Sequence, residues 1–307
     1  MSKKINISNW VAKSKNNPNK YALRQVIEIL INAIGHTKFL KGNMYLKGGT
    51  LMALAHESQR MTGDVDFSWL EPFHKDDFRD VDEIIRESLD ESMNMVRNKL
   101  GYLDLRCKVQ TIKKMPNGWR NNKLSTPALE MTIGFAKIGT RQAELLEINK
   151  SVQILRVDIS FNEKIKDYEE LILVDGSTSI NAYSPIEIIT EKYRALIQQA
   201  QRNHERNRRQ DVYDINFLIK HFDYDEDEKK LILENLIIKS ESRNIYPNYN
   251  SLSDMKVKEL AKKEWHTMEL ELMELPDFEG CYENIKNFYM SLPWDKNKKN
   301  PNSPTFD

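Results

Sequence analysis

The chain of 307 residues is long enough to bury the core of one large domain or two ordinary ones. Its 46 basic and 46 acidic side chains cancel, so a nucleic-acid partner would have to bind local clusters of positive charge. No signal-peptide pattern and no apolar run of transmembrane length is present, and Cys107 and Cys281 match no metal or redox spacing. We therefore expect a cytoplasmic protein with free thiols and no membrane partner.

The first half of the chain has the pattern of a mixed α/β domain. Helical periodicity of the apolar residues or helical composition predicts helices over 21–34, 50–57 and 81–101. Alternating or β-rich patterns predict strands over 44–46, 64–70, 104–114, 128–138 and 151–163. Clusters of Pro, Asn and Gly separate the last three strands, which indicates a partly antiparallel sheet.

The second half is predicted to be helical. Ser184-Pro185 is a typical start of a helix, and helical segments over 187–201 and 211–222 are joined by a basic stretch over 202–210. The helical pattern continues to about Ser291. We expect four parts: an N-terminal helical segment, an α/β domain, a helical domain that completes a cleft, and a flexible tail, over 1–40, 41–179, 180–294 and 295–307.

Two acids lie at the start of one predicted strand. Asp64 and Asp66 are two residues apart, so both side chains project from the same face of an extended strand. Carboxylate oxygens on one face suit Mg²⁺ or Mn²⁺, which keep several waters and take substrate phosphates as further ligands. The pair therefore indicates phosphoryl-transfer chemistry, although acids so spaced are more often a solvated strand end.

A glycine-rich turn precedes this strand. Gly48 and Gly49 would let the backbone approach a phosphate, and the amides that begin the following helix are donors for an anion. Thr50 adds a hydroxyl, and Lys47 and Arg60 can supply positive charge. The candidate nucleotide-binding residues here are Lys47, Gly48, Gly49, Thr50, Arg60 and Thr62.

The order of these parts resembles the first motif of the polymerase-beta-like nucleotidyltransferase superfamily, in which a Gly-Ser or Gly-Gly turn precedes an acid-x-acid pair. "KGGT" with "RMTGDVDF" is more closely similar to the AbiEii/MenT group of nucleotidyltransferase toxins, whose pattern is Lys-Gly-Gly-Thr followed by Arg-x-Ser-x-Asp-x-Asp. Thr62 stands where that group often has serine and keeps the hydroxyl. The resemblance implies a nucleotidyltransferase fold: a catalytic α/β (α+β) domain over 41–179 with a mixed sheet flanked by helices, plus the helical C-terminal domain.

A third carboxylate is expected to complete a two-metal site. Asp158 lies in mid-strand between Val157 and Ile159, where an acid without a partner would be costly. The resembled family carries a comparable "DIS" acid in its sheet. Glu130 and Glu163 are alternatives for the same role, and an acid on a solvated strand face is the simpler interpretation of Asp158.

The resemblance extends into the helical half. The segment "EKYRALIQQAQRNHERNRRQDVYDINFL" is similar to a lysine-bearing helix followed by an Arg-x-Lys-Asp-x-x-Asp-like segment. Lys192, Arg208 and Asp211 take the positions of the lysine, the arginine and the first acid, while Gln210 replaces the usual lysine. These cations would neutralise triphosphate charge, and Asp211 could orient either cation or hold a substrate group. Helix capping by Asp211 and a solvated basic face are the alternatives.

The resemblance implies an NTP-dependent, metal-requiring transferase that binds metal through Asp64, Asp66 and Asp158. In that interpretation Asp64, Asp66, Asp158, Lys192 and Asp211 are the catalytic residues. It implies further that the acceptor is the 3′ end of tRNA and that the protein is a translation-blocking toxin with a cognate antitoxin, linked to phage defence. Two other hypotheses stay open: a nucleotidyltransferase that modifies a protein or a small molecule, and an inactive scaffold that binds a nucleotide or a partner.

Two aromatic or basic features could contact RNA. Six Lys or Arg against three Glu give the stretch 187–209 a positive surplus. Trp119 in "MPNGWRNNK" could stack on a base, but covering the core is the commoner use of tryptophan.

Overall fold

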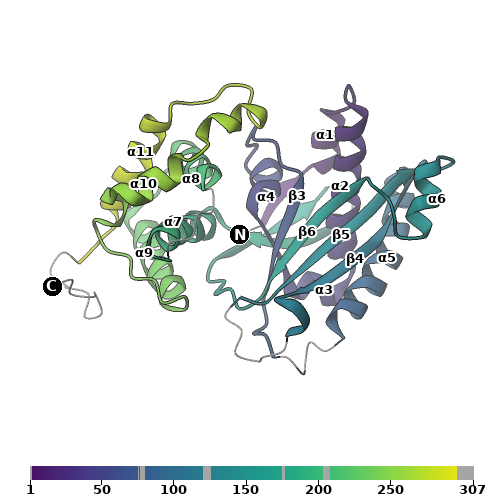
Figure 1. Ribbon diagram of the computed structural model, residues 1–307, viewed down its shortest axis with the longest axis horizontal. Helices are drawn as coiled ribbons and strands as arrows, with labels where there is room; N and C mark the ends of the chain where they lie inside the picture. The colour runs from purple at the N-terminus through teal and green to yellow at the C-terminus, as the bar shows by residue number, and fades with distance from the viewer. Residues whose placement is uncertain are drawn as a thin grey trace. The chain divides into compact units, whose positions relative to one another are not determined.

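One mixed sheet organises the first part of the protein. The computed structural model describes residues 2–74, 76, 80–119, 126–174, 177–202 and 208–295. Within these residues an eight-stranded sheet is formed (Figure 1), and its strands in sheet order are β1 (Ser2–Ile5), β7 (Tyr168–Leu173), β8 (Thr178–Tyr183), β2 (Met44–Lys47), β3 (Asp64–Trp69), β6 (Ile154–Ser160), β5 (Ala128–Lys137) and β4 (Leu105–Met115). The β1/β7, β2/β8 and β3/β6 pairs are parallel, and the other pairs are antiparallel.

The chain divides into two compact units. The first unit contains the described parts of 2–163 and 168–183, and the second contains 164–167 and the described parts of 184–295. The helices of the first unit are α1 (Ile7–Ala12), α2 (Pro18–His36), α3 (Lys38–Asn43), α4 (Gly48–Ala55), α5 (Val81–Lys99), α6 (Arg141–Glu147) and the 3₁₀ helix η1 (Asn117–Trp119). Those of the second are α7 (Pro185–Arg202), α8 (Arg209–His221), α9 (Glu226–Glu241), η2 (Ser251–Ser253), α10 (Met255–Lys262), η3 (Trp265–Leu270) and α11 (Phe278–Ser291).

The two faces of the sheet differ in polarity at its centre. Val65 and Phe67 in β3 and Val157 and Ile159 in β6 are fully buried, and they alternate with polar residues that point to the other face. On the apolar side α2 packs against α5, β6 and β8, and α5 packs against β4. Residues 25–35 of α2 are all buried, so this helix forms the centre of the first unit's core. The opposite face of β3 and β6 is polar and carries Asp64, Asp66 and Asp158.

The second unit is built from packed helices. α7 contacts α8, α9 and α10, and α11 packs against α8. α7 begins at Pro185, and the Ser184 hydroxyl accepts the Glu187 amide proton at 3.1 Å, as the Ser-Pro signal predicts. Within the described residues, no helix combines the length and apolar character needed to cross a membrane.

The predicted α/β fold class and the main elements are confirmed. Three strands lie outside the predicted set: β1, within the segment 1–40 that was expected to be helical, and β7 and β8 after residue 163. β8 extends to Tyr183 and thus continues past the domain boundary predicted near Ile180. The predicted tail over 295–307 lies, apart from Asp295, outside the described residues.

His56 links stability to pH in the first unit. It follows α4, its side chain is buried, and burial together with the positive charge of Lys3 lowers its pKa to about 4. An unfolded chain binds the proton at about pH 6.5, so the unfolded state holds more protons between pH 6.5 and 4 and stability falls as pH drops through this window. The expected loss is about 2 kcal/mol between pH 7 and pH 5.

Urea unfolding at pH 7 and pH 5 measures this effect. His56→Gln should show a smaller loss of stability over the same pH range, because it carries no titratable imidazole. His36→Gln, at an exposed position at the end of α2, controls for the general effect of removing a histidine. An unchanged pH dependence in His56→Gln would contradict the assignment.

Candidate active site

The turn between β2 and α4 is shaped by two glycines. Gly48 has φ +71°, and a Cβ built on it would overlap the Asp66 carboxylate. A Cβ on Gly49 would lie 2.8 Å from Arg60 Nη2 and 3.0 Å from Thr62 Oγ1. The missing side chains therefore leave room for three of the predicted site residues to lie against this turn, which we call the glycine turn (Lys47–Thr50).

Two threonines hold the beginning of β3. Thr50 is fully buried, and its Oγ1 donates to the backbone carbonyl of Asp64 at 2.7 Å. Thr62 Oγ1 donates to the same carbonyl at 3.3 Å. The Thr50 proton is thus used to fix the strand that carries the acids, which gives this residue a positioning role. Both threonines were predicted as nucleotide-binding residues.

The acids form a row across neighbouring strands. Asp66 in β3 is the register partner of Asp158 in β6, and Asp158 is the partner of Glu130 in β5. Asp64 lies two residues before Asp66 and therefore projects from the same face. We call Asp64, Asp66, Asp158 and Glu130 the acid face. Asp66 is half-buried and the other three side chains are exposed, so the row is open to a substrate.

The neighbouring acids of the acid face change the pKa of Asp158. Partial desolvation and the negative charges of Glu130 and Asp64 raise the pKa of the Asp158 carboxyl above its ordinary value. The positive charges of Lys47 and Arg156 oppose this rise. A carboxyl with a raised pKa binds a proton more readily, which suits a group that accepts the proton of an attacking hydroxyl.

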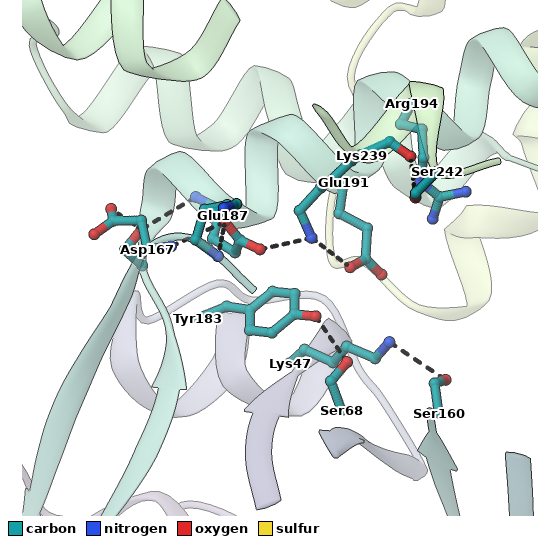
Figure 2. Close-up of polar contacts among 12 residues, drawn as sticks. Lys47, Ser68, Ser160, Asp167, Tyr183, Glu187, Glu191, Arg194, Lys239 and Ser242 are labelled. Atoms are coloured by element: carbon teal, nitrogen blue, oxygen red, sulfur yellow. Dashed lines mark hydrogen bonds and ion pairs between the residues drawn. The ribbon is translucent and has the colours of Figure 1, made fainter. Parts of the chain in front are cut away.

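Lys47 lies beside the acids on the same sheet. It is the register partner of Asp66 across β2 and β3, it is largely buried, and its Nζ lies 3.4 Å from Ser160 Oγ (Figure 2). The ammonium also lies 5.9 Å from the centroid of the Tyr183 ring, and the Tyr183 hydroxyl is 2.7 Å from Ser68 Oγ. Lys47 therefore places its amino group next to the acids.

The three polar neighbours of Lys47 were not among the predicted site residues. Ser68 and Ser160 follow the acids of their strands at two-residue steps, so the alternation that identified Asp66 also placed both serines on its face. Tyr183 carries no such signal, because β8 itself was not predicted.

The second unit holds another group of predicted residues. Lys192 Nζ in α7 lies 2.7 Å from Asp211 Oδ1 and 2.9 Å from Asp214 Oδ2. Arg208 Nη1 lies 3.3 Å from Asp211 Oδ2. We call Lys192, Arg208, Asp211 and Asp214 the helical charge cluster. Asp214 is fully buried and was not a predicted catalytic residue, although it lies one turn after Asp211 on the same helix face.

The cluster changes the interpretation of Lys192. Its ammonium contacts two carboxylates, and the four side chains together carry no net formal charge. Gln210, which replaces the lysine of the resembled pattern, donates to Glu271 at 2.9 and 2.8 Å. Residues 203–207 of the predicted basic stretch, with His204, Glu205 and Arg206, lie outside the described residues.

Trp119 belongs to the core. It is almost fully buried, its ring packs edge-on against Phe73 and Phe161, and its Nε1 donates to the Met115 carbonyl at 3.1 Å. The proposed base-stacking role is therefore unsupported, and the core role weighed against it is the one observed.

The ligand type and the positions of the acids can be compared with what a bound metal ion requires. Among the described residues, no three His, Cys, Asp or Glu side chains converge closely enough to enclose a metal ion. Mg²⁺ needs no such cage, because it is commonly bound by one or two carboxylates together with water and substrate phosphates. Asp64 and Asp66, on one face beside an open glycine turn, fit that mode.

Gly48→Ala tests the fit between the turn and Asp66. Both the positive φ and the overlap with Asp66 oppose a methyl group, so we expect a stability loss of about 1–3 kcal/mol and a displaced carboxylate. A misplacement of about 1 Å lowers catalysis on the order of a hundred-fold, which single-turnover nucleotide-transfer rates would measure. Gly42→Ala is the matched control, since a Cβ there meets no atom within 4 Å. Equal rates in the two variants would refute the prediction.

Comparisons with known proteins were made for the whole chain. No curated protein matched the sequence. Two crystal structures from Helicobacter pylori are similar to it: JHP933, at 16% identity and a TM-score of 0.45, covers 87% of this chain and 90% of its own. The other, provisionally described as a nucleotidyltransferase, has 15% identity, a TM-score of 0.44, and coverage of 87% and 91%.

A family model gives the assignment. The model of the AbiEii nucleotidyl transferase toxin of type IV toxin–antitoxin systems matches residues 33–284, which is most of the chain and includes both groups of candidate residues. The chain therefore belongs to the AbiEii family of nucleotidyltransferase toxins.

Proposed function

We propose that this nucleotidyltransferase transfers a nucleotide from an NTP to the 3′ end of tRNA in a metal-dependent reaction. The observation that carries the proposal is the register of Asp66 with Asp158, with Asp64 on the same face and the glycine turn packed against Asp66. This arrangement offers carboxylate oxygens and a close backbone approach at one place, which phosphoryl transfer requires.

The acids have separate roles in the proposal. Asp64 and Asp66 would hold Mg²⁺ or Mn²⁺, and the bound cation would neutralise phosphate charge and lower the pKa of an attacking hydroxyl. Asp158, the register partner of Asp66, would accept the proton of that hydroxyl. The acceptor oxygen forms a bond to the α-phosphorus, the bond from the α-phosphorus to the bridging oxygen breaks, and pyrophosphate leaves with its electron pair.

Cations stabilise the charge that develops on the leaving group. Lys47 begins the glycine turn and Arg60 lies against Gly49 of this turn, where the triphosphate would bind Gly48 and Gly49. Lys192 and Arg208 are further nucleotide-binding cations in this proposal, with Asp211 orienting both of them. Because Lys192 is also held by Asp214, its position is fixed before the nucleotide binds.

The biological role follows from the family and the acceptor together. A type IV toxin–antitoxin family implies a cognate antitoxin as a partner. Nucleotide addition to the 3′ end of tRNA converts the 3′-hydroxyl of the original terminal nucleotide into a phosphodiester, so an amino acid can no longer be attached there and translation would stop. Growth arrest of this kind would serve phage defence.

Transfer of labelled nucleotide tests the proposal. Purified protein with Mg²⁺ should label total tRNA from one of the four α-³²P NTPs, and periodate oxidation of the tRNA 3′ end beforehand should abolish labelling. EDTA should stop the reaction, and added Mg²⁺ or Mn²⁺ should restore it. Label found only on protein or on a small molecule would refute the tRNA acceptor, and activity unaffected by EDTA would refute the metal.

A further inference from the structure

The polar face of the sheet continues beyond the acids. Two rows of register partners lead from β3 across β6 and β5 to the edge strand β4. They are Asp64, Arg156, Thr132 and Thr111 in one row, and Asp66, Asp158, Glu130 and Lys113 in the other. We call Arg156, Thr132, Thr111 and Lys113 the outer strip. Each row therefore joins an acid of β3 to members of this strip on the same face.

The contacts of β4 show which of its side chains point to the polar face. Thr111 Oγ1 lies 2.7 Å from Thr132 Oγ1, so the two hydroxyls share a face. Lys114 instead pairs with Asp82 of α5 at 2.8 Å, on the opposite face. Because side chains alternate along a strand, Lys113 projects from the polar face together with Thr111.

Two members of the outer strip are exposed cations. Arg156 and Lys113 both lie at exposed positions, and within the described residues neither forms a hydrogen bond or an ion pair. The charge of Arg156 nevertheless reaches the acid face, since it opposes the rise in the pKa of Asp158. An open guanidinium and an open ammonium on one polar surface suit the phosphates of a nucleic-acid backbone.

The geometry of phosphoryl transfer assigns a substrate to this strip. The glycine turn follows β2 on one side of β3, whereas β6, β5 and β4 lie in order on the other side (Figure 1). If the triphosphate binds at the glycine turn, the attacking hydroxyl must approach the α-phosphorus from the side opposite the leaving pyrophosphate. The acceptor would therefore reach the acids across β6, where the outer strip begins.

We propose, on the basis of the function proposed above, that the outer strip binds the backbone of the single-stranded 3′ end of the acceptor RNA. Arg156 contacts a phosphate close to the reacting hydroxyl, and Lys113 contacts one further along the strand. Two strand spacings and one two-residue step separate the Cα atoms of these residues by about 12 Å, so the two cations serve different phosphates. Contacts of this kind position the RNA without reading its sequence.

Equilibrium binding of RNA without NTP tests the proposal, by fluorescence anisotropy of a labelled hairpin with a single-stranded 3′ overhang. Arg156→Gln and Lys113→Gln should each weaken binding about fivefold and lower the slope of log affinity against log salt by about 0.7. Arg156→Lys keeps the charge and should keep the slope. Lys137→Gln is the matched control, because Lys137 is an exposed cation of β5 on the opposite face of the sheet.

Transfer kinetics give a second measurement. Arg156→Gln and Lys113→Gln should raise the KM for tRNA and leave the KM for NTP unchanged. A higher KM for NTP with unchanged RNA affinity would place Arg156 at the triphosphate and overturn the proposal. So would unchanged RNA affinity and salt slope in both variants, even if the wild type transfers nucleotide to tRNA, which leaves the proposed function standing. Transfer by the wild type to protein alone would overturn both.

Discussion

Asp66→Asn should lower the rate of nucleotide transfer on the order of a thousand-fold while leaving the fold intact. The change removes one negative charge and almost no volume. Asp66 lies at the centre of the acid face, between Lys47 and Asp158 in the strand register, and its carboxylate occupies the space that Gly48 leaves open. An amide there cannot neutralise a divalent cation, so the triphosphate would lose its main partner.

Single-turnover transfer to tRNA and growth arrest on expression are the measurements. Asp104→Asn is the matched control, because Asp104 is an exposed acid of the same unit, 3.5 Å from Lys137, and lies outside the site. Growth arrest by Asp66→Asn at the wild-type level, in a protein that transfers no nucleotide, would favour the inactive scaffold over the transferase. Wild-type transfer would refute the role of Asp66.

Lys239→Met should destabilise the second unit by about 3–5 kcal/mol. Lys239 and Glu187 are almost completely buried, with Nζ 2.6 Å from Glu187 Oε1, and Glu191 lies at 3.7 Å (Figure 2). Burial raises the pKa of Glu187, and Lys239 is the chief group that lowers it. Without the lysine, Glu187 must either stay charged in an apolar surrounding or take up a proton, and both cost stability.

Urea unfolding followed by circular dichroism measures the loss. Adding Glu187→Gln to Lys239→Met should recover most of it, because a glutamine oxygen can still accept the amide protons of Lys166 and Asp167 that Glu187 now accepts. Lys258→Met breaks an exposed pair with Glu279, also at 2.6 Å, and should cost less than about 1 kcal/mol. Equal losses in Lys239→Met and Lys258→Met would contradict the prediction.

Local patterns were sufficient to predict the acids of β3, but not which strands lie beside β3 in the sheet. A two-residue spacing on a strand fixes the face on which Asp64 and Asp66 lie, whatever the rest of the fold. It does not say which strand comes next in the sheet. Asp158 was predicted as the third acid, with Glu130 and Glu163 as alternatives, and the register puts Asp158 beside Asp66 and Glu130 one strand further, while Glu163 follows the end of β6.

The sequence patterns did not predict the short strand β1 or all the ion-pair partners of Lys192, and the reason differs from that for the acids. β1 has four residues, too few to show a period, and its place in the sheet depends on pairing with β7 more than 160 residues later. Lys192 was predicted to neutralise triphosphate charge with Asp211 as a group that could orient it, because a sequence shows charges and not all of their partners. Asp214 is a second partner of Lys192, one turn beyond the predicted acid.

The pairing of β2 with β8 determines when the site can form during synthesis. β2 carries Lys47 and leads into the glycine turn, and its parallel neighbour in the sheet begins only at Thr178. A nascent chain that ends before this point lacks the strand between β2 and β7, so β2 keeps an unpaired edge and Tyr183 is missing beside Lys47. A ribosome that stopped within the first half of the message would therefore release no working fragment. The strand that is synthesised last, β8, is the one that lies between β7 and β2 in the sheet.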